Sequence, residues 1–255
     1  MSVVRLGQNF LADPNLLDAI VRESGVEATD VVLEIGGGEG ALSERLAPRV
    51  AKLWVVELDE RLRPELEELE AAHDSVGLVW GDAMHVDLAG LDPAPTRVVA
   101  NLPYSIATPV IIRTLAELST VESWTVMVQR EIGDRLRAAP GSKAYGSPSV
   151  VVQLCCRVEM LRTVDPAVFR PRPRVGSALL RLERTAPWPG DHVERVVRGA
   201  FAHRRKALAR SLSLAGVVSR ERAREALATL GLRDDARAES LEPAQFAALA
   251  EELAD

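Results

Sequence analysis

Residues 30–40, DVVLEIGGGEG, decide the fold class. Residues 31–35 form a short β-branched run typical of a buried parallel strand, and the run passes directly into Gly36, Gly37 and Gly38. Glycines at this point let a ligand approach the backbone, and a helix over residues 41–46 would begin with free N–H groups. The stretch therefore predicts the first strand, turn and helix of an α/β sheet that binds a ligand at its edge.

Three further apolar runs follow, and each ends at a side chain that can accept hydrogen bonds. The runs cover residues 53–56, 76–80 and 98–100, and they lead to Glu57, Asp82 and Asn101. Because the carboxyl ends of parallel strands meet at one edge of a sheet, these side chains are expected in a row there. Each acid alone is better explained as a turn or cap residue, so the prediction rests on the ordered series.

The glycine turn fits two kinds of cofactor. Gly36, Gly38 and Ala41 match G-x-G-x-x-G/A, and Glu57 follows where a dinucleotide-binding sheet carries its ribose-binding acid. The same pattern suits enzymes that use S-adenosylmethionine. Asp82 is placed to accept the adenine amine of a nucleoside cofactor, and Asn101 to lie at the cofactor's reactive end. This series favours S-adenosylmethionine, whereas no Tyr-x-x-x-Lys or catalytic His pattern supports an NAD-dependent oxidoreductase.

The segment Asn101-Leu102-Pro103-Tyr104 is the predicted catalytic element. The lone pair of an exocyclic adenine amine is delocalised into the ring, which makes the amine a poor nucleophile. The Asn101 side-chain oxygen and the Leu102 carbonyl can each accept one of its N–H groups and so favour the geometry in which nitrogen attacks. Pro103 stiffens the corner, and the Tyr104 ring can stack on a base lifted out of its strand. The simpler interpretation is a turn that ends a strand.

The rest of the first part of the chain predicts further elements of the same sheet. Helices are expected over residues 108–118 and 131–137, and strands over 124–128, 150–156 and 176–182, the last two pairing at the sheet edge. Residues 138–149 are expected to form a mobile loop over the site. Pro171 and Pro173 would hold Phe169 on a stiff loop, where its ring can cover the second face of the bound base. A core aromatic is the alternative for Phe169.

From residue 188 onward the pattern is helical only, with helices expected over residues 192–214, 220–230 and 243–253. We therefore predict a Rossmann-like α/β catalytic domain over residues 1–187 and a small all-helical domain over residues 188–255.

Charge is distributed unevenly along the chain. The net charge is −6, but residues 1–129 hold 9 basic and 21 acidic side chains, whereas residues 130–210 hold 17 and 7. A basic surface of this kind suits a nucleic-acid partner, with Arg204, Arg205 and Lys206 as candidate phosphate contacts. Solvated surface arginines are the alternative.

Several classes of protein are disfavoured. There is no run of about 18 apolar residues and no secretory signal pattern, so membrane insertion and secretion are not expected. Cys155 and Cys156 are adjacent, where a bridge would be strained, which suggests two reduced thiols in a cytoplasmic protein. The four histidines show no ligand spacing, so no metal is predicted.

Seven motifs, in the same order and at the same spacing, resemble the ribosomal RNA adenine dimethyltransferase family, and most closely its small-subunit branch. They are GQNFL (residues 7–11), EIGGGEG (34–40), VELD (56–59), GDA (81–83), NLPY (101–104), FRPRPRVGS (169–177) and AFAHRRKAL (200–208).

The resemblance implies dimethylation of two adjacent adenosines near the 3′ end of 16S ribosomal RNA. The substrate would be a small-subunit assembly intermediate, modified by a monomeric enzyme whose C-terminal helical domain recognises the RNA. S-adenosylmethionine contacts are implied for Asn9, Leu11, Gly36, Glu57, Asp82 and Asn101. Contacts with the target base are implied for Asn101, Leu102, Tyr104 and Phe169.

The sequence departs from the family pattern close to the predicted chemistry. Gly37 stands where the family usually has Pro, and Ser105-Ile106-Ala107 where it has Asn-Ile-Ser. Two alternatives stay open. One is a macrolide-resistance type of methyltransferase acting on 23S ribosomal RNA, although such enzymes usually read NIPY. The other is a non-catalytic RNA-binding assembly factor with the same fold.

Overall fold

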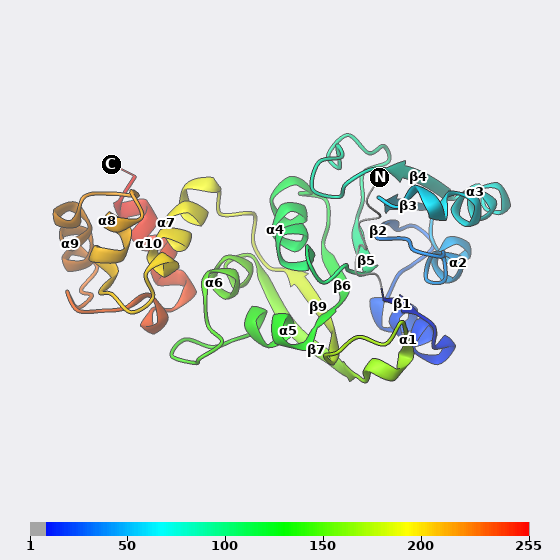
Figure 1. The fold of residues 1–255 in the computed structure, drawn as a ribbon. Coiled ribbons are helices and arrows are strands. Elements are labelled where there is room, and N and C mark those ends of the chain that lie inside the picture. The colour runs from blue at the N-terminus through cyan, green and yellow to red at the C-terminus, as the bar shows by residue number, and fades with distance from the viewer. Residues whose placement is uncertain (1–8, 255) are drawn as a thin grey trace, which may run out of the picture. The chain divides into compact units, whose positions relative to one another are not determined.

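The computed structural model describes residues 9–254, and the chain divides into two compact units (Figure 1). Unit 1 contains the residues up to Gly133 together with Glu159–Arg184, and unit 2 contains Asp134–Val158 and the chain from Thr185. Residues 134–158 thus group with the C-terminal helices. Gly7 and Gln8 of the first motif lie outside the described residues.

Unit 1 is built on a seven-stranded sheet of order β4-β3-β2-β5-β6-β9-β7. The strands are β2 (Val31–Ile35), β3 (Lys52–Glu57), β4 (Val76–Trp80), β5 (Arg97–Asn101), β6 (Ser123–Gln129), β7 (Cys156–Val164) and β9 (Ser177–Arg184). The strands from β4 to β6 in this order are parallel, and β9 runs antiparallel to β6. The carboxyl ends of β3 and β5 therefore lie at one edge, as predicted for a Rossmann-like sheet.

Helices and a short strand pair surround this sheet. The helices are α1 (Pro14–Ser24), α2 (Ser43–Leu46), α3 (Arg63–Ala72), α4 (Ala107–Glu117) and α5 (Arg130–Leu136). Separately, β1 (Phe10–Leu11) pairs antiparallel with β8 (Phe169–Arg170). Asp13 caps α1 by accepting from the Leu16 N–H at 2.9 Å, and Gly25 ends it at φ 62°. Buried side chains of α1, α2 and α3, among them Ile20, Leu46 and Leu66, join those of β2 and β3 in one core.

Unit 2 is helical. Its helices are α6 (Ser147–Gln153), α7 (Asp191–Ala202), α8 (Leu208–Leu214), α9 (Arg220–Thr229) and α10 (Pro243–Glu252). The ring of Phe201 stacks on Phe246 at 5.6 Å between centroids and meets Tyr145 edge-on at 5.8 Å. The buried Tyr145 hydroxyl donates to the Leu241 carbonyl at 2.9 Å, so the chain around residue 145 is fastened to the C-terminal helices.

Two predicted elements were wrong. Residues 150–156 were expected to form a strand, but Val150, Val151 and Val152 lie in α6, buried against α7 and α10. A short apolar run does not separate a buried strand from a buried helix. Residues 192–214 were expected to form one helix. The chain breaks between α7 and α8, where the Leu208 N–H donates to the Ala236 carbonyl at 2.8 Å instead of continuing a helix.

Candidate active site

The glycine turn after β2 is shaped by three residues in the left-handed region, Gly36 at φ 80°, Gly38 at φ 58° and Gly40 at φ 80°. The Gly36 N–H donates to the Val56 carbonyl at 2.8 Å, which fixes the turn against β3. A Cβ atom on Gly36 would lie 3.3 Å from Pro103 Cδ. Glycine at this position therefore lets the turn and the Asn-Leu-Pro-Tyr segment pack against each other.

Gly37, one of the departures named in the sequence analysis, is tightly enclosed. An added Cβ atom would lie 2.4 Å from Val55 Cγ1 on β3. Val55 is fully buried, so it occupies the space that a side chain at position 37 would take. Glycine at position 37 therefore lets Val55 of β3 pack directly against the turn.

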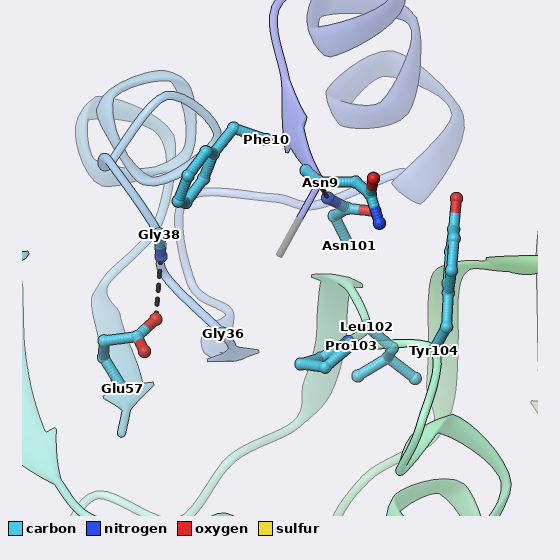
Figure 2. A pocket seen from close by; sticks show the side chains of 9 residues that line it. All are labelled: Asn9, Phe10, Gly36, Gly38, Glu57, Asn101, Leu102, Pro103 and Tyr104. Atoms are coloured by element: carbon cyan, nitrogen blue, oxygen red, sulfur yellow. Dashed lines mark hydrogen bonds between the residues drawn. The ribbon is translucent and has the colours of Figure 1, made fainter. Parts of the chain in front are cut away.

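Glu57, at the end of β3, is 6% exposed and binds three main-chain N–H groups, of which Figure 2 shows that of Gly38. Its Oε2 accepts from Gly38 at 2.9 Å, and its Oε1 accepts from Leu58 and Asp59, each at 2.8 Å. A carboxylate has about four acceptor positions, so Oε2 keeps one for a further donor. The glycine turn and the turn after β3 are therefore joined through one carboxylate that still has capacity for a hydroxyl group.

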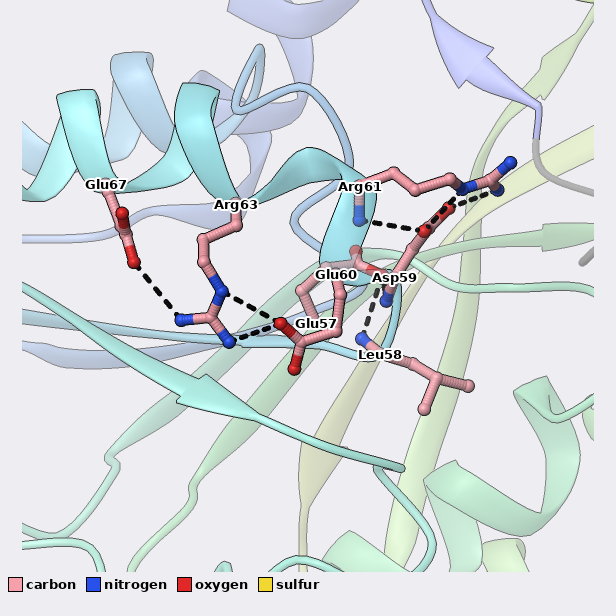
Figure 3. Close-up of polar contacts among 7 residues, drawn as sticks. All are labelled: Glu57, Leu58, Asp59, Glu60, Arg61, Arg63 and Glu67. Atoms are coloured by element: carbon pink, nitrogen blue, oxygen red, sulfur yellow. Dashed lines mark hydrogen bonds and ion pairs between the residues drawn. The ribbon is translucent and has the colours of Figure 1, made fainter.

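The turn after β3 is further fixed by ion pairs (Figure 3). The Asp59 carboxylate is 7% exposed and accepts from Arg61 Nε at 2.8 Å and Nη2 at 2.6 Å. Arg63 donates to Glu60 at 2.8 Å and to Glu67 at 3.1 Å. These pairs neutralise much of the acidic charge around Glu57 and hold the backbone that Glu57 binds.

Asn101 ends β5 and faces the N-terminal segment (Figure 2). Its Nδ2 donates to the Asn9 carbonyl at 3.2 Å. A carbonyl can only accept, so this contact requires the amide NH₂ to face Asn9 and leaves Oδ1 on the other side as an acceptor. The hydrogen bond thus orients the oxygen that the proposed chemistry needs.

Tyr104 is held at its hydroxyl, which lies 2.6 Å from the Ser177 hydroxyl at the start of β9. Ser177 is fully buried. Partial burial raises the pKa of the Tyr104 hydroxyl above its ordinary value, and the Ser177 contact only partly opposes this shift. Tyr104 therefore stays neutral at physiological pH and presents an aromatic face, not a charge.

A cavity of about 70 Å³ lies where these groups meet (Figure 2). Seven of its lining residues are predicted site residues: Asn9, Gly36, Glu57, Asn101, Leu102, Pro103 and Tyr104. Phe10 and Gly38 line it as well; Gly38 belongs to the predicted glycine pattern but was not named as a contact, and Phe10 was not assigned a role from the sequence. Both residues belong to the quoted motifs. Phe10 directly follows Asn9 and Gly38 lies two residues after Gly36, and this proximity could have identified them as lining residues.

Other predicted residues lie outside this cavity lining. Asp82 follows β4 with its side chain 39% exposed, accepting from the Met84 N–H at 2.8 Å and facing His85 Nδ1 at 3.1 Å. These contacts, that with Met84 foremost, lower the pKa of Asp82. Leu11 is buried in the core of unit 1.

The Phe169 ring also lies in that core, with 2% of the residue exposed. This placement fits the core-aromatic interpretation, and base contact by Phe169 stays a prediction.

The predicted phosphate contacts differ from one another. In unit 2, Arg204 Nε donates to Glu239 at 2.8 Å, and its Nη2 donates to the Ser142 carbonyl at 3.3 Å. Arg205 and Lys206 are exposed. Arg204 thus has a structural partner, whereas its two neighbours present their charge to solvent.

Across residues 9–254, no group of three or more His, Cys, Asp or Glu side chains is arranged to hold a metal ion. Cys155 and Cys156 are buried free thiols. No helix in this part of the chain is long and apolar enough to cross a membrane.

The fold and the sheet edge together define a class: a Rossmann-like methyltransferase that binds a nucleoside cofactor beside an Asn-Leu-Pro-Tyr segment. The family model described as ribosomal RNA adenine dimethylase matches residues 3–255. The chain belongs to this family, whose members are enzymes that use S-adenosylmethionine.

Named relatives agree with this assignment. A protein of Rubrobacter xylanophilus named ribosomal RNA small subunit methyltransferase A is 45% identical over 96% of this chain and 92% of its own length. A protein of the same name from Pseudomonas putida is 40% identical over 98% and 94%.

Two solved structures are similar in fold. A dimethyladenosine transferase from Plasmodium falciparum has a TM-score of 0.79 at 24% identity, covering 94% of this chain and 95% of its own. The 23S rRNA methyltransferase ErmE has a TM-score of 0.68 at 28% identity, covering 97% and 100%.

The residues present fit S-adenosylmethionine. Glu57 retains an acceptor position for a ribose hydroxyl, Gly36 and Gly38 leave the turn open to close approach, and Asp82 offers a carboxylate to an amine. The negative charge at Glu57 also suits a cationic sulfonium cofactor.

Proposed function

We propose that this enzyme transfers methyl groups from S-adenosylmethionine to N6 of two adjacent adenosines near the 3′ end of small-subunit ribosomal RNA. The relatives named as small-subunit methyltransferases are 38–45% identical to this chain, whereas ErmE is 28% identical. The observation that carries the chemistry is the fixed orientation of Asn101, whose Oδ1 is left to accept an amine proton.

Two acceptors would prepare the target amine for attack. Asn101 Oδ1 accepts one N–H and the Leu102 carbonyl accepts the other, which localises the nitrogen lone pair. The Leu102 N–H donates to the Met127 carbonyl at 3.1 Å, so the residue that carries this second acceptor is anchored to β6 through its preceding peptide. Once methylated, the nitrogen is a strong acid and releases its proton to water. No side-chain base is needed, which agrees with a cavity whose titratable lining residues are Glu57 and the neutral Tyr104.

The target base would stack on Tyr104. Base stacking on an aromatic ring contributes about 1–3 kcal/mol, and it needs a ring held in one orientation. The hydrogen bond to buried Ser177 provides that restraint. Phe169 would reach the second face of the base only if its ring left the core in which it is packed.

S-adenosylmethionine supplies an electrophilic methyl group on a positively charged sulfur. Glu57 would bind a ribose hydroxyl, and Asp82 would accept from the adenine amine. Asn9, Leu11 and Gly36 would complete the binding surface, and the Asn101 side chain would contact both the cofactor and the target base.

RNA would contact the exposed side chains of Arg205 and Lys206 in unit 2. Arg204 is committed to Glu239 and the Ser142 carbonyl, so its main role in this proposal is to hold the turn between α7 and α8. Phosphate binding by the two exposed side chains releases counterions and makes RNA affinity depend on salt.

The enzyme is proposed to act as a cytoplasmic monomer on a small-subunit assembly intermediate. Primer extension across the 3′ end of 16S ribosomal RNA tests this function in cells. Two adjacent stops from dimethyladenosine are expected with the gene present and none when it is deleted. Stops in 23S ribosomal RNA instead would favour the macrolide-resistance type of activity, and no change in either RNA would favour a non-catalytic assembly factor.

A further inference from the structure

The turn that carries Asp82 is held from outside by one arginine. Arg113, on α4, donates from Nη1 to the Ala83 carbonyl at 2.6 Å and from Nη2 to the Val86 carbonyl at 2.7 Å. Its Nε donates to Glu117 at 2.8 Å, and its side chain is only 14% exposed. The planar guanidinium thus fixes two main-chain carbonyls of one turn at the same time.

Apart from Arg113, the turn is held where it begins, because the Gly81 N–H donates to the Glu57 carbonyl at 2.9 Å, and the Ala83 side chain is buried. The Asp82 carbonyl accepts from His85 N at 2.7 Å and from Val86 N at 2.9 Å, and these bonds close the turn without fastening it to the rest of the chain. Asp82 itself is partly exposed. Past Gly81, Arg113 therefore ties the main chain of the turn, at Ala83 and Val86, to α4.

We propose that Arg113 is a positioning residue that holds Asp82 where it recognises the adenine amine of the cofactor, an inference that rests on the proposed function. The helix that carries Arg113 begins at Ala107, shortly after Tyr104. Arg113 thus joins the adenine end of the cofactor site to the segment that receives the target base.

The chain offers a matched control at the other end of α4. Arg184 donates to the main-chain carbonyls of Leu115 at 3.2 Å, Leu118 at 3.0 Å and Val121 at 2.7 Å. Arg184→Met removes comparable arginine–carbonyl bonds, but none of them holds the Asp82 turn. It is expected to lower the melting temperature without changing adenine recognition.

The test compares the affinities of S-adenosylhomocysteine and S-inosylhomocysteine by calorimetry. The inosyl compound has a carbonyl in place of the amine and would face the Asp82 carboxylate with an acceptor. Wild type should prefer the adenosyl compound by about tenfold or more. Asp82→Ala should abolish most of that preference. Arg113→Met should reduce the preference nearly to that of Asp82→Ala. Arg184→Met should keep the wild-type ratio of affinities.

An Arg113→Met protein with the wild-type preference would overturn the inference. If thermal melting shows that Arg113→Met is unfolded, Arg113→Lys is tested instead, because it keeps the charge but loses the two parallel hydrogen bonds of the guanidinium. A reduced preference for the adenosyl compound is expected for this variant. An unchanged preference contradicts the inference. Equal wild-type affinities for the two compounds would also refute it, while leaving methyl transfer to RNA intact. Failure of wild type to bind either compound would refute the proposed cofactor site as well.

Discussion

Replacing Asn101 by alanine tests the proposed activation of the amine. The substitution removes an acceptor that works mainly in the transition state, and loss of one such positioned group lowers a rate by about 100- to 1,000-fold. It also removes the 3.2 Å hydrogen bond to the Asn9 carbonyl, a contribution of about 0.5–1.5 kcal/mol. The substitution would also remove one contact of Asn101 with the cofactor, and loss of one neutral hydrogen bond lowers the cofactor affinity by no more than about tenfold, much less than the rate.

Single-turnover methylation with saturating RNA and cofactor isolates the chemical step. Asn15→Ala is a suitable control, because Asn15 is exposed on α1 and outside the cavity lining, and it should retain the wild-type rate. A near-normal rate for Asn101→Ala would refute the mechanism even if the wild-type protein methylates RNA. A loss fully restored by more cofactor would show that Asn101 acts in binding alone.

Three further predictions concern the cofactor, the pH dependence of stability and the RNA. Glu57→Ala should weaken S-adenosylmethionine binding by roughly 1.5–3 kcal/mol in calorimetry, since a charge-assisted hydrogen bond is lost; unchanged affinity would remove the basis of the ribose assignment. Burial raises the pKa of Glu34 from 4.5 to about 8, so the folded chain holds a proton that the unfolded chain releases between these values. The free energy of unfolding should then fall as pH rises from 4.5 to 8, by up to about 5 kcal/mol, and Glu34→Gln should remove this decline in denaturant titrations at a series of pH values. Neutralising Arg205 and Lys206 should flatten the salt dependence of RNA binding by about 0.7–0.9 log units per lost phosphate contact, whereas Arg204→Gln should mainly lower the melting temperature; a wild-type salt slope in the double variant would contradict the RNA surface.

Local sequence pattern was sufficient for the strands that carry the site. Residues 76–80 form β4 as predicted, and β2 and β5 lead to the glycine turn and to Asn101. Parallel strands that alternate with helices place their carboxyl ends at one edge of the sheet. The position of Glu57 and Asn101 at the same cavity could therefore be predicted from strand order.

Contacts between segments that are distant in the sequence could not be predicted from local pattern. The hydrogen bond from Asn101 to Asn9 and that from Tyr104 to Ser177 join residues far apart in the sequence, and neither leaves a periodic signal. The same holds for Phe169, whose burial depends on the pairing of β8 with β1.

Burial on all sides also misled the prediction of α6. Its consecutive valines suit a strand by propensity, but packing against two other helices decides its conformation.

The most direct test of the proposed function uses the purified protein, S-adenosylmethionine and small subunits from cells that lack this modification. Mass spectrometry of nuclease-digested 16S ribosomal RNA should show N6,N6-dimethyladenosine at two adjacent positions near the 3′ end, and Asn101→Ala should give almost none in the same time. Absence of methylated adenosine with the wild-type protein, or its appearance only in 23S ribosomal RNA, would contradict the proposed function.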